Sequence, residues 1–175
     1  MRFKPVPMPA QESNLEEARR AIPLVPAGEP DCLRRIRERL DIHDETEARA
    51  WLAFLRALGL VVRTPRGFRR TRLERDVETL HEPFRQRVYA ADEALSALSS
   101  ADRPLTAVEV ADRIVHCEPT WERRRRVDHE EYWRERTGRL LEWAVRLQLA
   151  DRVEPGTHPV VAEPAPSAYR PKTRR

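Results

Sequence analysis

Apolar residues recur at intervals of three and four along most of the chain, and this spacing predicts a protein built mainly from amphipathic helices. The clearest helix is predicted over residues 44–58, where the apolar stripe consists of Ala48, Trp51, Leu52, Leu55 and Leu58. Asp44 and Glu47 have the spacing of a capping box, in which Asp44 accepts a hydrogen bond from the backbone N–H of Glu47. Gly59 then ends the helix, because glycine most easily takes the left-handed conformation.

Two shorter helices are predicted upstream of this one. Ser13 and Glu16 have capping-box spacing and open a helix that continues to about Ile22. An apolar stripe in residues 32–40 predicts a second helix, with Asp31 as its cap. Only four residues separate this helix from the next, as in a helix–turn–helix.

After the third helix the pattern changes to that of a β-hairpin. Leu60–Val62 favours a strand, Pro65–Gly67 favours a turn, and Phe68 begins the second arm. Helices followed by a basic hairpin, over residues 15–72, resemble the winged helix–turn–helix superfamily. This resemblance implies a three-helix core with a β-hairpin wing.

The same order recurs in the second half of the chain. A helix led by the capping box of Thr106 and Glu109 precedes a longer helix led by the box Asp128–Glu131. Ala150–Val153 and Val160–Val161 are then predicted to form the arms of a second hairpin. The chain therefore reads as a degenerate duplication.

We predict a mainly α protein of tandem winged-helix-like modules joined by one long helix, Pro83–Ser99, with disordered termini. The expected segments are a disordered N-terminal segment (1–12), a first winged-helix module (13–72), a linking segment with the long helix (73–102), a second winged-helix-like module (103–162) and a disordered basic tail (163–175). In architecture and in its Arg-rich, Lys-poor composition the chain resembles small uncharacterised winged-helix proteins of archaea. That resemblance implies DNA binding or an association with transcription.

The charge distribution agrees with an anionic partner for the first module. Residues 1–72 hold 15 basic and 10 acidic side chains, residues 73–162 hold 14 and 18, and residues 163–175 hold 4 and 1. The positive surplus is thus concentrated in the first module and the tail. A GC-rich genome is an equally good explanation for the preference for Arg over Lys.

The predicted first wing is the main candidate site. It carries five arginines and no acidic residue, namely Arg63, Arg66, Arg69, Arg70 and Arg72. Guanidinium groups beside a duplex bind phosphates and release counterions, so we expect contacts with double-stranded DNA. The alternative is a solvated hairpin whose arginines pair with neighbouring carboxylates.

The predicted recognition helix gives a mixed signal. Arg49 and Arg56 are candidate base or backbone contacts. The first turn, which would enter a major groove, carries Asp44, Glu45 and Glu47, and phosphate would repel these carboxylates. We therefore expect the wing to dominate DNA binding, with weak sequence selectivity.

A second basic cluster supports a different function. It lies in the predicted loop between the helices of the second module and comprises Trp121, Arg123, Arg124, Arg125 and Arg126. Nearby carboxylates offset its charge, but an exposed Trp beside arginines also suits a protein partner. The second hypothesis is therefore an adaptor or subunit that docks a protein through its second module without binding DNA.

No catalytic, cofactor or metal site is predicted. Residues His129–Trp133 begin like a zinc-protease helix, but Trp133 stands where the second His ligand is required. Cys32 and Cys117 lie in apolar helical patterns and are expected to be structural thiols. The sequence contains no signal peptide and no apolar run long enough for a membrane span, so we expect a cytoplasmic protein without enzymatic activity.

Overall fold

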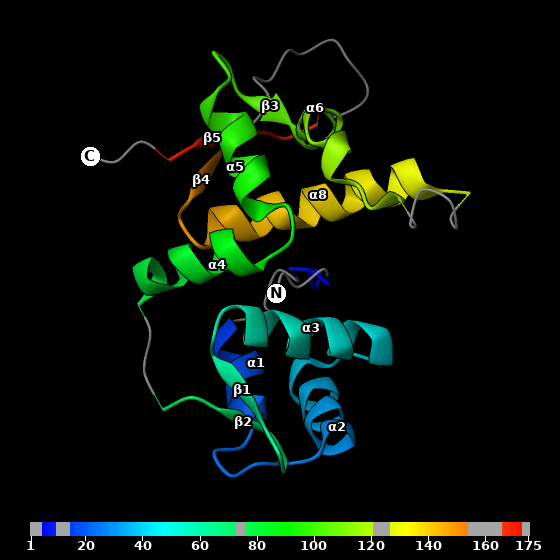
Figure 1. Cartoon of the computed structure of the whole chain (residues 1–175), viewed down its shortest axis with the longest axis vertical. Helices are drawn as coiled ribbons and strands as arrows, with labels where there is room; N and C mark the ends of the chain where they lie inside the picture. Colours follow the sequence, from blue (N-terminus) through cyan, green and yellow to red (C-terminus); the bar gives the residue numbers. More distant parts are fainter. Residues whose placement is uncertain (1–4, 10–14, 73–75, 121–126, 154–165, 173–175) are drawn as a thin grey trace. The chain divides into compact units, whose positions relative to one another are not determined.

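The computed structural model describes residues 5–9, 15–72, 76–120, 127–153 and 166–172 (Figure 1). The chain divides into two compact units, Met1–Tyr89 and Ala90–Arg175, and each is described by itself. Both are mainly helical with a small antiparallel sheet. The predicted fold class is confirmed in this respect.

Three helices form the core of the first unit: α1 (Leu15–Ala21), α2 (Glu29–Leu40) and α3 (Glu45–Ala57). α3 packs against both of the others. It contributes Trp51, Phe54 and Leu55 to the core, all of them almost completely buried. The predicted apolar stripe therefore does face the interior.

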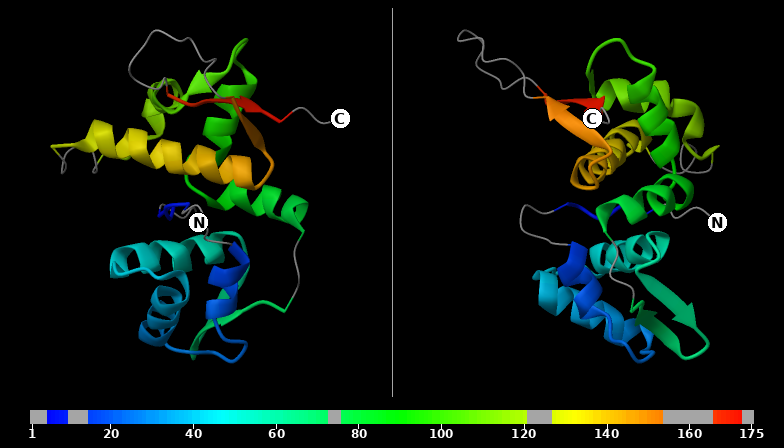
Figure 2. Two further views of the ribbon diagram at one scale, coloured as in Figure 1. Left: turned by 180° about the vertical axis from the view of Figure 1, so that it is seen from behind. Right: turned by 90° about the vertical axis from the view of Figure 1, so that its left-hand side faces the viewer.

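A hairpin of β1 (Val61–Thr64) and β2 (Gly67–Arg70) follows α3 and projects from the helices of this unit (Figure 2). The strands are antiparallel, with Thr64 opposite Gly67, so Pro65 and Arg66 form the two-residue tip. This is the predicted wing.

A third segment extends the sheet on the other side of β2. Ala27 and Phe68 exchange two backbone hydrogen bonds, with N–O distances of 2.9 and 2.8 Å. The N–H of Arg70 donates to the carbonyl of Pro23 over 2.9 Å. β2 is therefore central, between β1 and the loop that joins α1 to α2.

Gly67 is the point where the hairpin fits most tightly against that loop. Its φ of 120° lies in the region that side-chain-bearing residues rarely adopt. A Cβ atom there would lie 2.0 Å from the carbonyl oxygen of Ala27, well inside van der Waals contact. Only glycine fits both constraints.

The segment after the wing differs from the prediction. The short helix η1 (Val77–Leu80) leads into α4 (His81–Arg87), and α5 begins separately at Ala91. The single helix predicted over Pro83–Ser99 is therefore wrong. Val88 is extended and Ala90 has a φ of 64°, which stops the helix although the apolar spacing continues through it. α4 packs on α3 through an edge-to-face contact between Phe84 and Phe54, with ring centroids 6.4 Å apart.

The second unit contains α5 (Ala91–Ser99), β3 (Leu105–Thr106), α6 (Ala107–Arg113), η2 (Val115–Cys117), α8 (His129–Arg146), β4 (Ala150–Val153) and β5 (Ala168–Pro171). α8 is its longest helix and buries Trp133, Leu140 and Trp143. The indole N–H of Trp133 donates to the carbonyl of Ala111 over 3.1 Å and ties α8 to α6.

The sheet of the second unit has the order β3–β5–β4, so its last strand is central. The first unit has the same arrangement, with the Ala27 segment, β2 and β1 in the corresponding places. Both units follow the order helix, edge segment, two helices, strand and central strand. This shared topology is that of two winged-helix modules.

Two predictions for the end of the chain need correction. β4 pairs with Ala168–Pro171, whereas Val160–Val161, the predicted partner, lies outside the described residues. Residues 168–171 fall within the predicted disordered tail, yet they form the centre of the sheet and bury Tyr169. The Pro-rich composition around them concealed this strand.

The N-terminal segment is also more ordered than predicted where it is described. Val6 is buried, and the backbone N–H of Met8 donates to the carboxylate of Glu47. Glu47 is thus not the reciprocal partner of Asp44. Asp44 instead caps α3 by accepting from the N–H of Thr46 over 2.8 Å.

The other predicted caps vary in outcome. Thr106 and Glu109 form the complete capping box at the start of α6. Asp31 lies inside α2, which begins at Glu29 with Pro30 in its first turn. Asp128 makes no side-chain cap at α8, and Ser13 lies outside the described residues. Within the described part of the chain, no helix is long and apolar enough to cross a bilayer.

The capping box at α6 predicts a pH dependence of stability. Hydrogen bonds from Arg103 and then from the backbone N–H of Thr106 lower the pKa of Glu109 from 4.5 to about 2. A carboxylate with a depressed pKa stabilises the fold above its unfolded-state pKa, and this contribution is lost as the pH falls through 4.5 toward 2. Glu109→Ala should therefore lower the melting temperature at neutral pH, and the difference from wild type should close across this acidic window. Glu131→Ala, which also removes an acid from the first turn of a helix, is the control. If it changed the melting temperature as much as Glu109→Ala at every pH, the prediction would be contradicted.

Gly67 predicts a second effect on stability. Gly67→Ala should lower the free energy of unfolding of the first module by about 1–3 kcal/mol, because the new Cβ strains the backbone and meets the Ala27 carbonyl. Urea denaturation measures this change. Gly138→Ala is the matched control, because a Cβ there comes no closer than 3.8 Å to Ala107 and alanine favours a helix over glycine by up to about 1 kcal/mol. Opposite signs for the two variants are expected, and a neutral Gly67→Ala would refute the tight fit.

Candidate nucleic-acid interface

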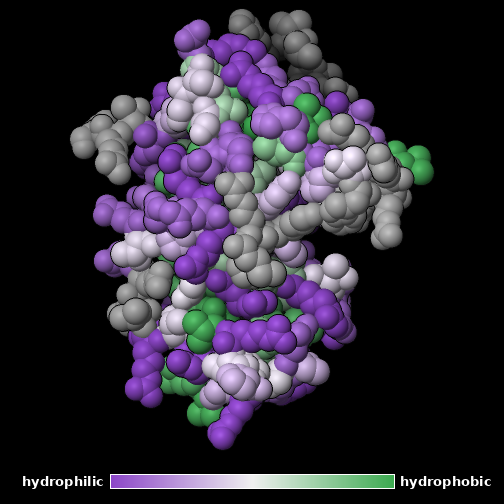
Figure 3. Space-filling model, viewed as in Figure 1, coloured by the Kyte–Doolittle hydropathy of each residue, from purple (hydrophilic) through white to green (hydrophobic). Residues whose placement is uncertain are grey.

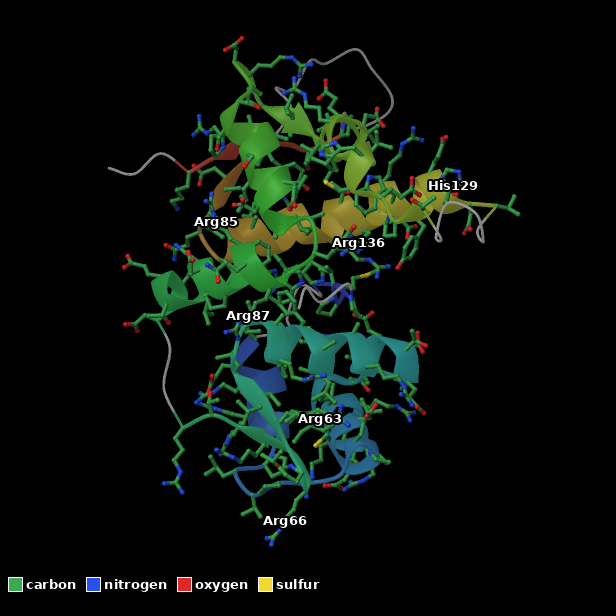
Figure 4. The ribbon with its side chains drawn as sticks, in the orientation of Figure 1. Arg63, Arg66, Arg85, Arg87, His129 and Arg136 are labelled. Carbon is green, nitrogen blue, oxygen red and sulfur yellow. The ribbon has the colours of Figure 1, made fainter. Side chains whose placement is uncertain are left out.

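The first wing is a rigid platform for its arginines. At the turn, the Thr64 hydroxyl donates to the carbonyl of Gly67 over 3.0 Å and accepts from the N–H of Arg66 over 3.3 Å. Pro65 fixes one backbone angle of the tip. Arg66 therefore projects from an ordered turn and points away from the rest of the module (Figure 4).

The five wing arginines keep their charge available. Arg63, Arg66 and Arg72 are exposed, and Arg69 and Arg70 are half-exposed. Among the described residues, no carboxylate lies within ion-pairing distance of any of the five. Residues 61–72 contain no acid at all. Among the described residues, the wing arginines are therefore not paired with neighbouring carboxylates, as the alternative hypothesis expected.

Arginines on α2 give the contrasting case. Arg34 pairs with Asp31 and, over 2.9 Å, with Glu38. Arg35 pairs with Asp31 over 2.8 Å, and Arg39 pairs with Glu17 of α1 over 2.7 Å. These three helix arginines are therefore paired with carboxylates, whereas among the described residues the wing arginines are not.

α3 offers little positive charge to a groove. Seven of its 13 residues are buried, which leaves a narrow exposed stripe that includes Glu45, Thr46 and Arg49. Arg49 pairs with Glu45 over 2.6 Å and with Glu29 of α2 over 3.1 Å. Hydrogen bonding to Glu45 raises the pKa of Arg49 and holds the guanidinium against the helix.

Arg56, at the C-terminal end of α3, is joined to the wing by an aromatic ring. Its guanidinium lies 5.4 Å from the centroid of Phe68, and that of Arg63 lies 5.9 Å from the same ring. Both are within the range of cation–π contact. Burial lowers the pKa of Arg56, and the charge of Arg63 lowers it further, partly offset by Glu29. Two cations thus converge at Phe68, in the pair of residues next to the one that closes the turn, and a bound anion would relieve their repulsion.

The second module has no equivalent basic surface in its described strands. Arg152 of β4 pairs with Glu142 of α8, which also accepts from the hydroxyl of Tyr169. Arg170 and Lys172 both lie within 4 Å of Asp151, at 3.9 and 3.6 Å. Residues 90–175 contain 15 basic and 15 acidic side chains, so the whole positive surplus belongs to the first unit.

A pocket of about 260 Å³ lies at the start of α8. At its wall the buried carboxylate of Glu118 lies 3.0 Å from Nδ1 of His129. The lining residues include no Ser, Thr or Cys, so this pair faces no side-chain nucleophile of the usual kind. In the part of the chain that the structure describes, no three His, Cys, Asp or Glu residues are grouped to hold a metal ion.

The structure brings together most of the predicted site residues but not all. Arg63 and Arg56 meet over Phe68, the other wing arginines share the same hairpin, and Arg49 is held apart by its acidic partners. Trp121 and Arg123–Arg126 lie outside the described residues. The sequence analysis did not predict the contacts of Phe68 with Arg56 and Arg63, although the register of the hairpin indicates that with Arg63. It also did not predict the ion pair of Arg49 with Glu29, which no local sequence signal indicates.

The family model described as the halobacterial double winged helix domain matches residues 1–163. No curated protein sequence and no solved structure matches the chain.

Proposed function

The chain belongs to the halobacterial double winged helix domain family, and from this premise we propose that it binds double-stranded DNA through the wing of its first module. The binding is largely to the phosphate backbone and weakly selective for sequence, as suits a chromatin- or transcription-associated protein. The single observation that carries the proposal is the set of wing arginines without acidic partners among the described residues.

The electrostatic reason is specific to this surface. A cation already paired with a carboxylate gives up that pair when it binds phosphate, so its net gain is small. The wing arginines have no such pair to give up within the described chain, and each phosphate they contact releases condensed counterions. Arg66 lies at the tip, and Arg69 and Arg70 follow on β2, where successive side chains point to opposite faces, so the wing presents cations on both faces.

Weak sequence selectivity follows from α3. Helix–turn–helix proteins read bases with a recognition helix in the major groove, but here Glu45 and Glu29 hold Arg49 and repel phosphate. The second module adds no net positive charge. The proposal therefore assigns DNA affinity to the first module and leaves the second for other contacts.

The wing is tested by replacing Arg66, Arg69 and Arg70 with Ala. Affinity for a random-sequence duplex should fall, and the slope of log K against log salt should become shallower by about 0.9 for each phosphate that the variant no longer neutralises. Fluorescence anisotropy across a salt series measures both. The control replaces Arg34, Arg35 and Arg39, which removes the same charge from ion-paired positions, and should change the slope much less. Equal slopes in wild type and the wing variant would refute the proposal, as would the absence of binding by wild type at low salt.

The ion pairs of Arg49 predict a gain of function. Replacing Glu29 and Glu45 with Gln removes two negative charges and releases the guanidinium toward solvent. DNA affinity should rise several-fold at low salt, with a slope steeper by about 0.9 if Arg49 then reaches a phosphate. Replacing Glu130 and Glu135 of α8 with Gln makes the same charge change in the second module and should have less effect. No difference between the two pairs would show that α3 lies away from the duplex.

A further inference from the structure

Two adjacent apolar side chains are exposed next to the wing. They are Leu24 and Val25, which are 46% and 74% exposed, in the loop between α1 and α2. Single exposed apolar residues are ordinary. This pair is unusual because Pro23 and Pro26 flank it and restrict the backbone, so the two side chains are presented in a pre-ordered loop.

Hydrogen bonds fix the loop beside the basic strand. The carbonyl of Pro23 accepts from Arg70, and Ala27 pairs with Phe68. Leu24 and Val25 therefore lie between two points at which the loop is bonded to β2, the strand that carries Arg69 and Arg70. Figure 3 shows apolar surface directly beside hydrophilic surface at the wing end of the first module.

We infer that Leu24 and Val25 form the apolar part of the DNA interface and contact the sugars and base edges in the groove beside the phosphates that the wing binds. This inference rests on the proposed function and deepens it. A duplex presents sugar and base-edge surfaces in a groove that phosphates flank, and groove-binding proteins contact such surfaces with apolar side chains. The rigid loop lowers the entropy cost of binding.

Among anionic partners, duplex DNA fits better than a lipid surface. Membrane binding grows with the apolar area inserted, and stable attachment requires an extended amphipathic face or an acyl chain in addition to basic residues. Two side chains on a short loop supply little of that area. They suffice for a local contact within a groove.

The test replaces Leu24 and Val25 with Ser in the full chain and measures binding to a random-sequence duplex across a salt series. The affinity should fall on the order of tenfold by the same factor at every salt concentration, because the two side chains carry no charge. The slope should stay that of wild type, unlike that of the wing variant. Heparin, a polyanion without bases, should displace the duplex from the variant more easily than from wild type.

The matched control replaces Val108 and Val115 with Ser. These are 45% exposed apolar residues of the second module, and binding should not change. Thermal melting checks the fold of each variant. If the double variant at Leu24 and Val25 melts earlier than wild type, Val25→Ser alone, at the more exposed position, replaces it in the same assay.

The outcomes separate the two proposals. Wild-type binding with an unchanged double variant overturns the inference and leaves the proposed function intact. An equal fall in affinity for DNA and for heparin also overturns it, because the lost contact would then not be specific to the sugars and bases of DNA. A weakened affinity only for vesicles of anionic phospholipid would assign the loop to a membrane and overturn it too. If wild type binds no duplex at low salt, the proposed function and the inference fail together.

Discussion

The pair of backbone hydrogen bonds between Ala27 and Phe68 holds the small sheet of the first module together. It joins the loop after α1 to the second strand of the wing, and so it turns a two-stranded hairpin, which is marginal by itself, into part of a three-segment sheet. Gly67 permits the close approach. The same pairing places Phe68 where Arg56 and Arg63 meet, and it holds Leu24 and Val25 beside the arginines. Geometry, charge and apolar surface at this end of the module all depend on one contact between distant parts of the chain.

Electrostatics then distinguishes the two modules, although their topology is the same. In the second module the basic residues of β4 and β5 are paired with Glu142 or Asp151, whereas in the first the wing carries no acid. The two modules differ in the positions of their acidic residues. Neither the helix packing nor the strand order requires this difference.

The sequence predicts the helical elements well because periodicity and caps are local signals. The apolar stripe of α3 and the complete box of Thr106 and Glu109 are examples. Signals that depend on distant partners are not visible in this way. The strand at 168–171 lies in a Pro-rich stretch and is ordered by β3 and β4, and the break at Ala90 interrupts an apolar pattern that a continuous helix would equally satisfy. At the candidate site, the wing arginines could be identified from composition, but the pairing of Arg49 with Glu29, from another helix, could not.

The central position of β5 has a consequence for how the protein is made on the ribosome. Leu105 pairs with Tyr169, so the sheet of the second module cannot close until residues 168–171 have been synthesised. The corresponding contact of the first module joins Ala27 to Phe68 and is available much earlier. The entropy cost of loop closure must be met before such distant contacts form. The first module can therefore fold while β3 and β4 of the second still lack the central strand β5. The nascent chain therefore presents its basic wing before the strand at residues 168–171 completes the sheet of the second module.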